Sequence, residues 1–477
     1  MLETMLKSAR PNRNYVSLIA MIAVIALWLM GAAMSQAGAA GRDTRATMDD
    51  ASRHASVTPD AVPTHLTREQ AVEYALKHNR ILKAATEDLA AAIQRVKQAE
   101  ADFYPKLDAA YTFRRFSQQP TMTLGAMDTT FPFAIQTSNR WEVALVQPLF
   151  TGFALEAQYK MSKAGQKLSG YQLEEVRLNL VRDVQTSYLQ VLLAARLLEV
   201  ARDNVESLQV QRRNADALRK QGVAAENDVL KAEVALSQAI QRERNAAKQL
   251  VILRSNLNRL LDIDLQANVE LAGINEKTSP VPPLDELYAM AEATRPEYLA
   301  MATSIKQAEY GKTAARSRYY PKVSAFAEYY REGEDFVADR NPYTNNDNAA
   351  VGVKVEMNLF EGGKTRASEL EWEHRRGAIV QRRDDLRQQI RLQVETAVEQ
   401  LRVAEANIET TRVALKQAEE NERITTLQYK EQVVIFLEVL NAQVFVAQTR
   451  ADFYQALYGY AIAMAELERA IGTSTGL

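Results

Sequence analysis

The chain has 477 residues, and its 58 lysines and arginines nearly balance its 60 aspartates and glutamates. This balance gives no electrostatic reason to expect nucleic acid as a partner. The absence of cysteine excludes disulfides, thiolate metal sites and cysteine nucleophiles, and it argues against a lipid anchor on an N-terminal cysteine.

Residues 1–39 have the features of a secretory signal peptide. Basic residues precede an apolar stretch at about 15–30, and small residues around Ala37 and Ala39 suit a cleavage site. The stretch is short for a membrane helix, which needs about 20 apolar residues. We therefore expect cleavage, with 40–65 as a loose polar leader. A retained membrane anchor is the alternative.

The remaining chain contains two copies of one unit, 66–262 and 284–472, with a linker at 263–283 and a tail at 473–477. Short motifs recur in the same order, which is hard to obtain by chance. The pairs are Leu66–Ala71 with Leu284–Leu287, Phe103–Leu107 with Tyr319–Val323, Gln147–Phe150 with Met357–Phe360, and Asn227–Leu230 with Leu437–Leu440.

Each unit is predicted to open with one helix. Thr67 and Gln70 form a capping box at the first helix start, and Pro105 ends that helix after Tyr104. The opening helix of the second unit ends in the same way at Pro321.

Two segments with a period of two follow each opening helix. In the clearest of them, apolar residues alternate with polar residues or glycine from Val351 to Leu359. The other segments begin near Leu107, Trp141 and Val323. Each has about ten residues, the length of a tilted strand that crosses a bilayer. A soluble hairpin is the alternative, but no other strands are expected for a core sheet, and Lys354 and Glu356 suit an aqueous lumen.

A very long helix comes next in each unit, at about 152–221 and 364–431. Both carry apolar residues at the alternating spacing of four and three that is typical of coiled coils. About 70 residues make a helix of about 100 Å. Gly222 ends the first, and a shorter helix then returns, so each unit could pack as an antiparallel layer.

Four membrane strands cannot close a barrel, because single-chain bacterial barrels have at least about 8 strands. Strand edges in lipid must be paired. Three chains would supply about 12 strands, and the long helices would extend such a barrel as a tube.

In these features the chain resembles the TolC-type outer-membrane efflux and secretion proteins. The residues that carry the resemblance are the Leu66-Thr67 opening, Tyr104–Lys106, Gln147–Phe150 with Gly152, Leu359–Gly363, Gly222 with Asp228–Leu230, and Glu438–Ala442. The resemblance implies a homotrimer without enzymatic activity or cofactor. It implies a 12-stranded β-barrel in outer-membrane lipid, continuous with a coiled-coil α-barrel in the periplasm. The expected partners are a periplasmic adaptor and an inner-membrane pump, in drug or metal efflux or in type I secretion.

The resemblance also implies a gate at the periplasmic end of the tunnel, lined by acidic residues. The matching positions are Glu438 and Asn441, with Asp228 as the repeat counterpart of Glu438 and Tyr429 nearby. Asn441 makes the ring less negative than two acids would. Val434 stands where relatives can carry a gate arginine, which puts a charged latch in doubt. Alternatively, Asp228 and Glu438 are solvated residues near helix ends.

The two helix turns are the expected adaptor contacts. They comprise Gly222, Val223 and Ala224 in the first unit and Gln432, Val433 and Val434 in the second. The run from Val433 to Phe436 is unusually apolar for a turn, and exposed apolar patches often mark partner surfaces. Burial within the hairpin is the alternative.

Three enzyme-like or metal-like patterns carry little weight. Gly362–Thr365 lacks the first glycine of a phosphate-binding loop, and Gly472–Gly476 has no room for the helix after a serine-hydrolase elbow. The four histidines show no metal-ligand spacing. Besides the export duct, one further hypothesis stays open: a structural coiled-coil protein anchored in the inner membrane, which would have no use for the strand pairs.

Overall fold

The structure, a computed structural model, describes residues 65–125, 129–222, 224–274, 280–431 and 433–473. All of them belong to one structural unit, Thr64–Leu477. The expected signal peptide at 1–39 and all but the last residue of the expected leader lie outside the described residues.

The described part of the first half contains short terminal elements, two strands that belong to the main sheet, and two long helices. In chain order, its elements are β1 His65–Leu66, α2 Arg68–His78, α3 Arg80–Ala101, β2 Lys106–Arg115, β3 Thr121–Leu124, β4 Thr129–Pro132, β5 Thr137–Phe150, α4 Ala154–Lys220 and α5 Glu226–Leu261.

The second half repeats this order, except that its described residues contain no counterpart of β3 and β4. Its elements are β6 Glu270–Leu271, α6 Leu284–Thr294, α7 Pro296–Arg316, a 3-10 turn at Ser317–Tyr319, β7 Lys322–Gly333, β8 Asp347–Glu356, α8 Lys364–Lys430 and α9 Phe436–Ala470. The long helices α4 and α8 have 67 residues each, and the helices that follow them have 36 and 35. Such matching lengths are expected of a duplicated unit.

The opening helix of each half is broken, so the prediction of one continuous helix is wrong. Asn79 leaves the helical conformation, with a ψ of 129°, and its Oδ1 accepts hydrogen bonds from backbone N–H groups in the first turn of α3. In the second half the break precedes Pro296, which occupies the first position of α7, where a missing N–H costs nothing. The predicted capping box of Thr67 and Gln70 is present.

Four strands form one antiparallel sheet in the order β2–β5–β7–β8, so β2 and β8 are its edges. The register aligns Leu107, Leu145, Ala327 and Val351 across the sheet on one face. Charged residues such as Glu142 alternate with them and occupy the opposite face. The apolar face is uncovered along β8, where its valines, Val351, Val353 and Val355, are 63–65% exposed.

Two expectations about strands are wrong. The alternation was expected to continue to Leu359, but β8 ends at Glu356. Beyond it, the Asn358 side chain accepts a hydrogen bond from the N–H of Phe360 and turns the chain out of the ladder. Strands also exist outside the main sheet, because β3 pairs with β4, and β1 pairs with β6.

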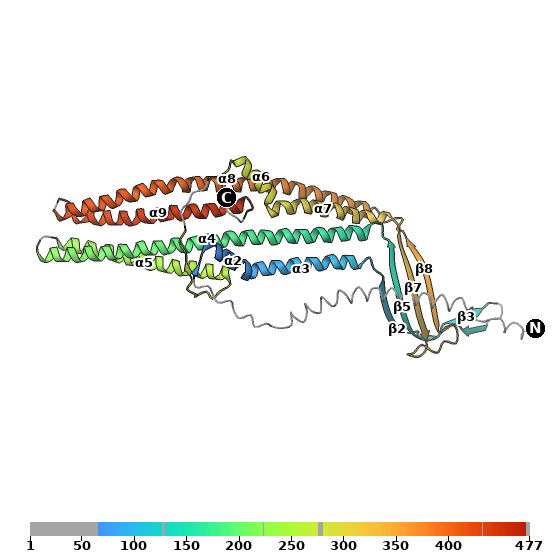
Figure 1. Ribbon diagram of the computed structural model, residues 1–477. Coiled ribbons are helices and arrows are strands. Elements are labelled where there is room, and N and C mark those ends of the chain that lie inside the picture. Colours follow the sequence, from blue (N-terminus) through green and yellow to red (C-terminus); the bar gives the residue numbers. More distant parts are fainter. Residues whose placement is uncertain (1–64, 126–128, 223, 275–279, 432, 474–477) are drawn as a thin grey trace, which may run out of the picture. The chain divides into compact units, whose positions relative to one another are not determined.

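The two shorter helices of each half lie along the long helix of the same half, α3 and α5 along α4, and α7 and α9 along α8 (Figure 1). The halves join where α4 packs against α7 and α9. This leaves α8 at one side of the helical layer and α3 with α5 at the other. No helix in the described ranges is both long and apolar enough to cross a membrane.

Each half has a buried cluster that packs against the first part of its broken opening helix, α2 in the first half and α6 in the second. In the first half, the Tyr188 hydroxyl donates to the carbonyl of Ala272 at 2.7 Å and lies 3.0 Å from that of Leu66. Burial raises the pKa of Tyr188 to about 12, so this phenol stays neutral. In the second half the cluster surrounds Ile390, Val394 and Leu467, which are fully buried.

Candidate functional site

The turns that end the long helices carry exposed residues. In the α4–α5 turn, Gly222 is exposed with a φ of 76°, and Ala224 is half-buried. After α8, the N–H of Val433 donates to the carbonyl of Gln428 at 2.8 Å, a helix-ending pattern. Of the other predicted contact residues, Val434 is half-buried, while Val223 and Gln432 lie outside the described residues.

The apolar run after α8 is divided between surface and core. Val433 and Ile435 are 70% and 64% exposed, so burial within the hairpin does not account for them. Phe436, by contrast, is 1% exposed, and its assignment to the surface patch is wrong. It clusters with Leu208 of α4 and Ala232 of α5, and so joins the ends of the two helical hairpins.

Two of the four predicted gate residues, Tyr429 of α8 and Asp228 of α5, lie near each other although they belong to different hairpins. The rings of Tyr429 and Phe436 lie 5.4 Å apart. Burial, together with the nearby carboxylate of Asp228, raises the pKa of Tyr429 above its usual value. Asp228 also lies 3.9 Å from Lys231 and sits in the first turn of α5, where a helix favours negative charge.

The other two predicted gate residues lie on the exposed side of α9. Glu438 is in its first turn, and Asn441 follows one turn later. Asn441 lines a groove of about 400 Å³ between α9 and α5, whose apolar wall includes Leu230 and Val234. The sequence interpretation did not single out this groove, although Leu230 and Val234 are apolar residues four positions apart and therefore lie on the same side of α5.

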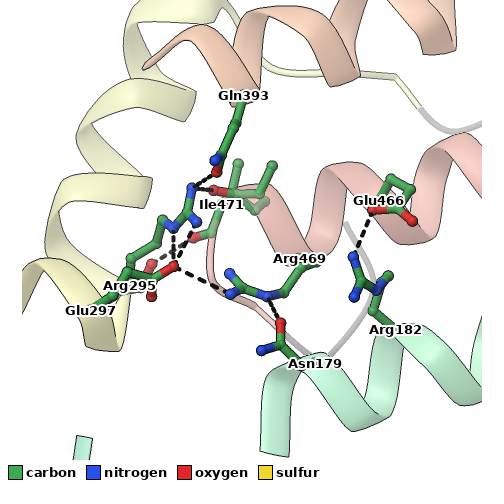
Figure 2. Close-up of polar contacts among 10 residues, drawn as sticks. Asn179, Arg182, Arg295, Glu297, Gln393, Glu466, Arg469 and Ile471 are labelled. Atoms are coloured by element: carbon green, nitrogen blue, oxygen red, sulfur yellow. Dashed lines mark hydrogen bonds and ion pairs between the residues drawn. The ribbon is translucent and has the colours of Figure 1, made fainter. Parts of the chain in front are cut away.

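A polar cluster, the junction network, lies where α6 meets α7 and was missed at the level of sequence. Arg295 is 4% exposed and contacts Glu297 at 2.5 Å and the Gln393 side chain at 2.7 Å. Arg469 donates to Asn179 at 2.6 Å and lies 3.2 Å from Glu297. Figure 2 shows these contacts joining α4, α7, α8 and α9.

The electrostatics of the junction network follow from its burial. Burial lowers the pKa of Arg295, although the Glu297 carboxylate opposes that shift. Burial alone would raise the pKa of Glu297, but the hydrogen bonds from Arg295 and the backbone, together with the charges of Arg295 and Arg469, outweigh it and hold that pKa below its usual value. The charged Arg-Pro-Glu sequence between two helical stretches was the available signal for this site.

The Gly362–Thr365 motif gains no support as a phosphate-binding loop, and most of the Gly472–Gly476 motif lies outside the described residues. Gly362 and Gly363 have φ values of 59° and 83° and form the turn between β8 and α8, a conformation that glycine adopts readily. Within the described ranges, no group of three or more His, Asp or Glu side chains could hold a metal ion.

The model of the family described as "Outer membrane efflux protein" matches residues 71–262 and 287–473 of this chain. The chain belongs to this family. Its members are outer-membrane channels of efflux and type I secretion systems rather than enzymes. The family is located in the outer membrane with a large periplasmic part, which does not fit the inner-membrane structural alternative.

Two curated members of the outer membrane efflux protein family are similar to this chain. The alkaline protease secretion protein AprF of Pseudomonas aeruginosa is 24% identical over 330 residues, 68% of each chain. The outer membrane efflux protein BepC of Brucella suis is 21% identical over 401 residues, 84% of each chain.

Solved structures show the same fold. The CmeC outer membrane channel of Campylobacter jejuni superimposes with a TM-score of 0.75 at 15% identity, covering 86% of both chains. The VceC outer membrane protein of Vibrio cholerae gives a TM-score of 0.72 at 17% identity, covering 85% of this chain and 96% of its own.

Proposed function

We propose that three copies of this chain form a passive exit duct, with a 12-stranded barrel in the outer membrane and a helical tunnel in the periplasm. The observation that carries the proposal is a four-stranded sheet with one exposed apolar face and two unpaired edges in a family of outer-membrane channels. Unpaired edges are too costly in lipid to remain open, so neighbouring copies must pair β2 with β8.

The sheet has the height of a membrane band. Aromatic contacts flank most of the length of β5: Tyr111 contacts Trp141 at 4.7 Å, four residues after the strand begins, and Phe150 at its end contacts Phe153 at 5.4 Å. The strand between Trp141 and Phe150 is about 30 Å long at about 3.3 Å per residue. A tilt of about 40° reduces this to about 23 Å, close to the apolar band of such barrels.

The helices support a tunnel that continues from the sheet. α4 begins at Ala154, directly after β5, and α8 begins soon after β8. Both free sides of the helical layer carry exposed apolar residues, such as Val251 on α5 and Val403 on α8. Pairing of these sides between copies would bury them and close the layer into a tube.

The ends of the helical hairpins suit a gate and a partner surface. Exposed Val433 and Ile435 would contact a periplasmic adaptor of an inner-membrane pump, together with the other turn residues named above. Glu438 and Asn441 would line the constriction, with Asp228 and Tyr429 beside it.

Crosslinking tests the assembly directly, because the chain has no cysteine of its own. One cysteine is fixed at Val353 on β8, and a second is moved along β2. Some position on β2 should form a disulfide between chains, and the product should run as a covalent trimer after extraction from outer membranes in mild detergent.

The double variant with cysteines at Val353 and Val143 serves as the matched control, because Val143 lies on the same face of the sheet but on β5, which is paired on both sides.

Orientation is tested with a tag at Asn346, which should be reachable on intact cells because longer loops face outside. A monodisperse soluble monomer without crosslinks along β2 would refute the duct.

A further inference from the structure

The loop that follows β7 folds back onto the apolar face of the sheet. Gly333 lies on this face, since it is in register with Asn139 two positions from Trp141. Ala338 packs so closely on Gly333 that a Cβ there would lie 2.5 Å from the Ala338 carbonyl carbon. Only glycine admits this approach, and Ala338 is completely buried by it.

Several hydrogen bonds hold this fold-back loop, residues 334–340, in place. The indole N–H of Trp141 donates to the carbonyl of Phe336 at 2.8 Å. The side chain of Asn139 donates to the carbonyl of Glu334 at 2.8 Å. Arg331 donates to the carbonyl of Ala338 at 3.3 Å and pairs with Asp339. The loop is thus fastened to β5 and β7.

The loop keeps a strained residue. Ala338 has a φ of 62°, a left-handed conformation that a residue with a Cβ rarely adopts. Such strain persists only where the surroundings over-determine the backbone, and it often marks a functional site. Here the strained turn returns the chain to the sheet directly after Phe336 and Val337.

The turn leaves two apolar side chains exposed. Phe336 and Val337 are 64% and 59% exposed, although their loop is fastened on both sides. The Phe336 ring lies 5.5 Å from the ring of Tyr111 and 5.3 Å from that of Trp141. Phe336 and Val337 therefore extend the apolar face of the sheet. In membrane proteins, aromatic residues are enriched at the membrane–water interface, because that interface solvates both their apolar and polar parts.

We propose that Phe336 and Val337 form a wedge that inserts among the acyl chains of the outer leaflet. The inference rests on the proposed duct, because it takes the apolar face of the sheet as the lipid-facing one. Its occupant is lipid, since the wedge is continuous with that face and contacts two of its aromatic residues. The fastened loop would fix the depth at which the sheet sits in the bilayer.

Single cysteines carrying an environment-sensitive fluorophore test this in the full-length protein, reconstituted into phosphatidylcholine vesicles with doxyl-labelled chains. A label at Val337 should be quenched by doxyl groups near the headgroups, and a label at Val353 by deeper ones. A label at Phe133 is the control: it is exposed directly after β4, which pairs with β3 and does not belong to the main sheet, and it should stay unquenched.

Trp141→Phe removes the N–H that fastens the loop and keeps an aromatic side chain at this position. Quenching at Val337 should then fall severalfold while quenching at Val353 is unchanged, which a general loss of folding would not produce. Quenching at Val353 without quenching at Val337 would overturn the wedge and leave the duct intact. No quenching at either position would overturn the lipid-facing assignment and the duct with it.

Discussion

At the residue scale, the junction network depends most on Glu297, which pairs with two arginines that are almost inaccessible to solvent. The exposed side-chain fractions are 15% for Glu297, 5% for Arg295 and 11% for Arg469. A charge pair of this kind contributes little relative to an apolar core, but loss of one partner leaves the other charge buried and unpaired. The equivalent junction of the first half uses neutral Asn79, so the two halves differ in chemistry at the same helix break.

Glu297→Gln should destabilise the helical layer by about 3–5 kcal/mol at neutral pH, because both arginines lose their counter-charge. The wild-type contribution should be fully present above the ordinary glutamate pKa of 4.5 and be lost as pH falls below it, because the folded-state pKa is lowered. Guanidinium midpoints, followed by circular dichroism at neutral and acid pH, measure both effects.

Glu420→Gln is the matched control, because Glu420 pairs with Arg423 on the exposed surface of α8. Its unfolding midpoint should not change measurably. Equal midpoints for the two variants would mean that the buried pair does not hold the helices together.

At the element scale, the break between α2 and α3 is a specific connection that hydrogen bonds of Asn79 hold in place. The Asn79 side chain caps α3 through its oxygen, and its Nδ2 donates to the carbonyl of Leu260 at 2.8 Å. One residue thus ends one helix, begins the next and ties both to the end of α5.

Asn79→Ala should cost about 1–2 kcal/mol for the lost cap, and about 1–3 kcal/mol more for the unsatisfied carbonyl of Leu260. Hydrogen exchange should accelerate at the α2–α3 junction and at the end of α5. Asn245→Ala, an exposed change within α5, should leave both regions as they are. Protection lost uniformly along the helices would argue against a local join.

At the scale of the whole molecule, the proposed gate depends on assembly. A single chain leaves Glu438 exposed on α9, but in a trimer three copies would approach the axis. Like charges in a narrow aqueous throat attract cations and repel one another. Asn441 adds no charge, so Glu438 would dominate the constriction.

Glu438→Gln should therefore lower cation selectivity in planar-bilayer recordings and weaken block by multivalent cations. Glu438→Ala should also raise conductance if the side chain narrows the throat. The control is Glu405→Gln on the exposed surface of α8. If the substitutions at Glu438 and Glu405 leave ion selectivity equally unchanged, the gate lies elsewhere in the tunnel.

Local patterns in the sequence were enough for the main elements. The period of two around Val353, the coiled-coil spacing in both long helices, and the capping box at Thr67 reflect interactions within a few residues. They therefore predicted elements that the structure contains. The repeated motifs and the family resemblance extended this to the class of protein, which the family match confirms.

Only the tertiary structure decided where side chains from distant segments meet. Phe436 looked like part of an exposed turn, but α4 and α5 cover it. Arg469 binds Asn179, which is 290 positions away, and no local periodicity reports such a pair. The fold-back loop likewise depends on strand register, which brings Trp141 to Phe336. These contacts depend on burial and on hydrogen bonding between residues that lie far apart in the sequence. An apolar or charged side chain gains or loses free energy only through the neighbours that the fold supplies.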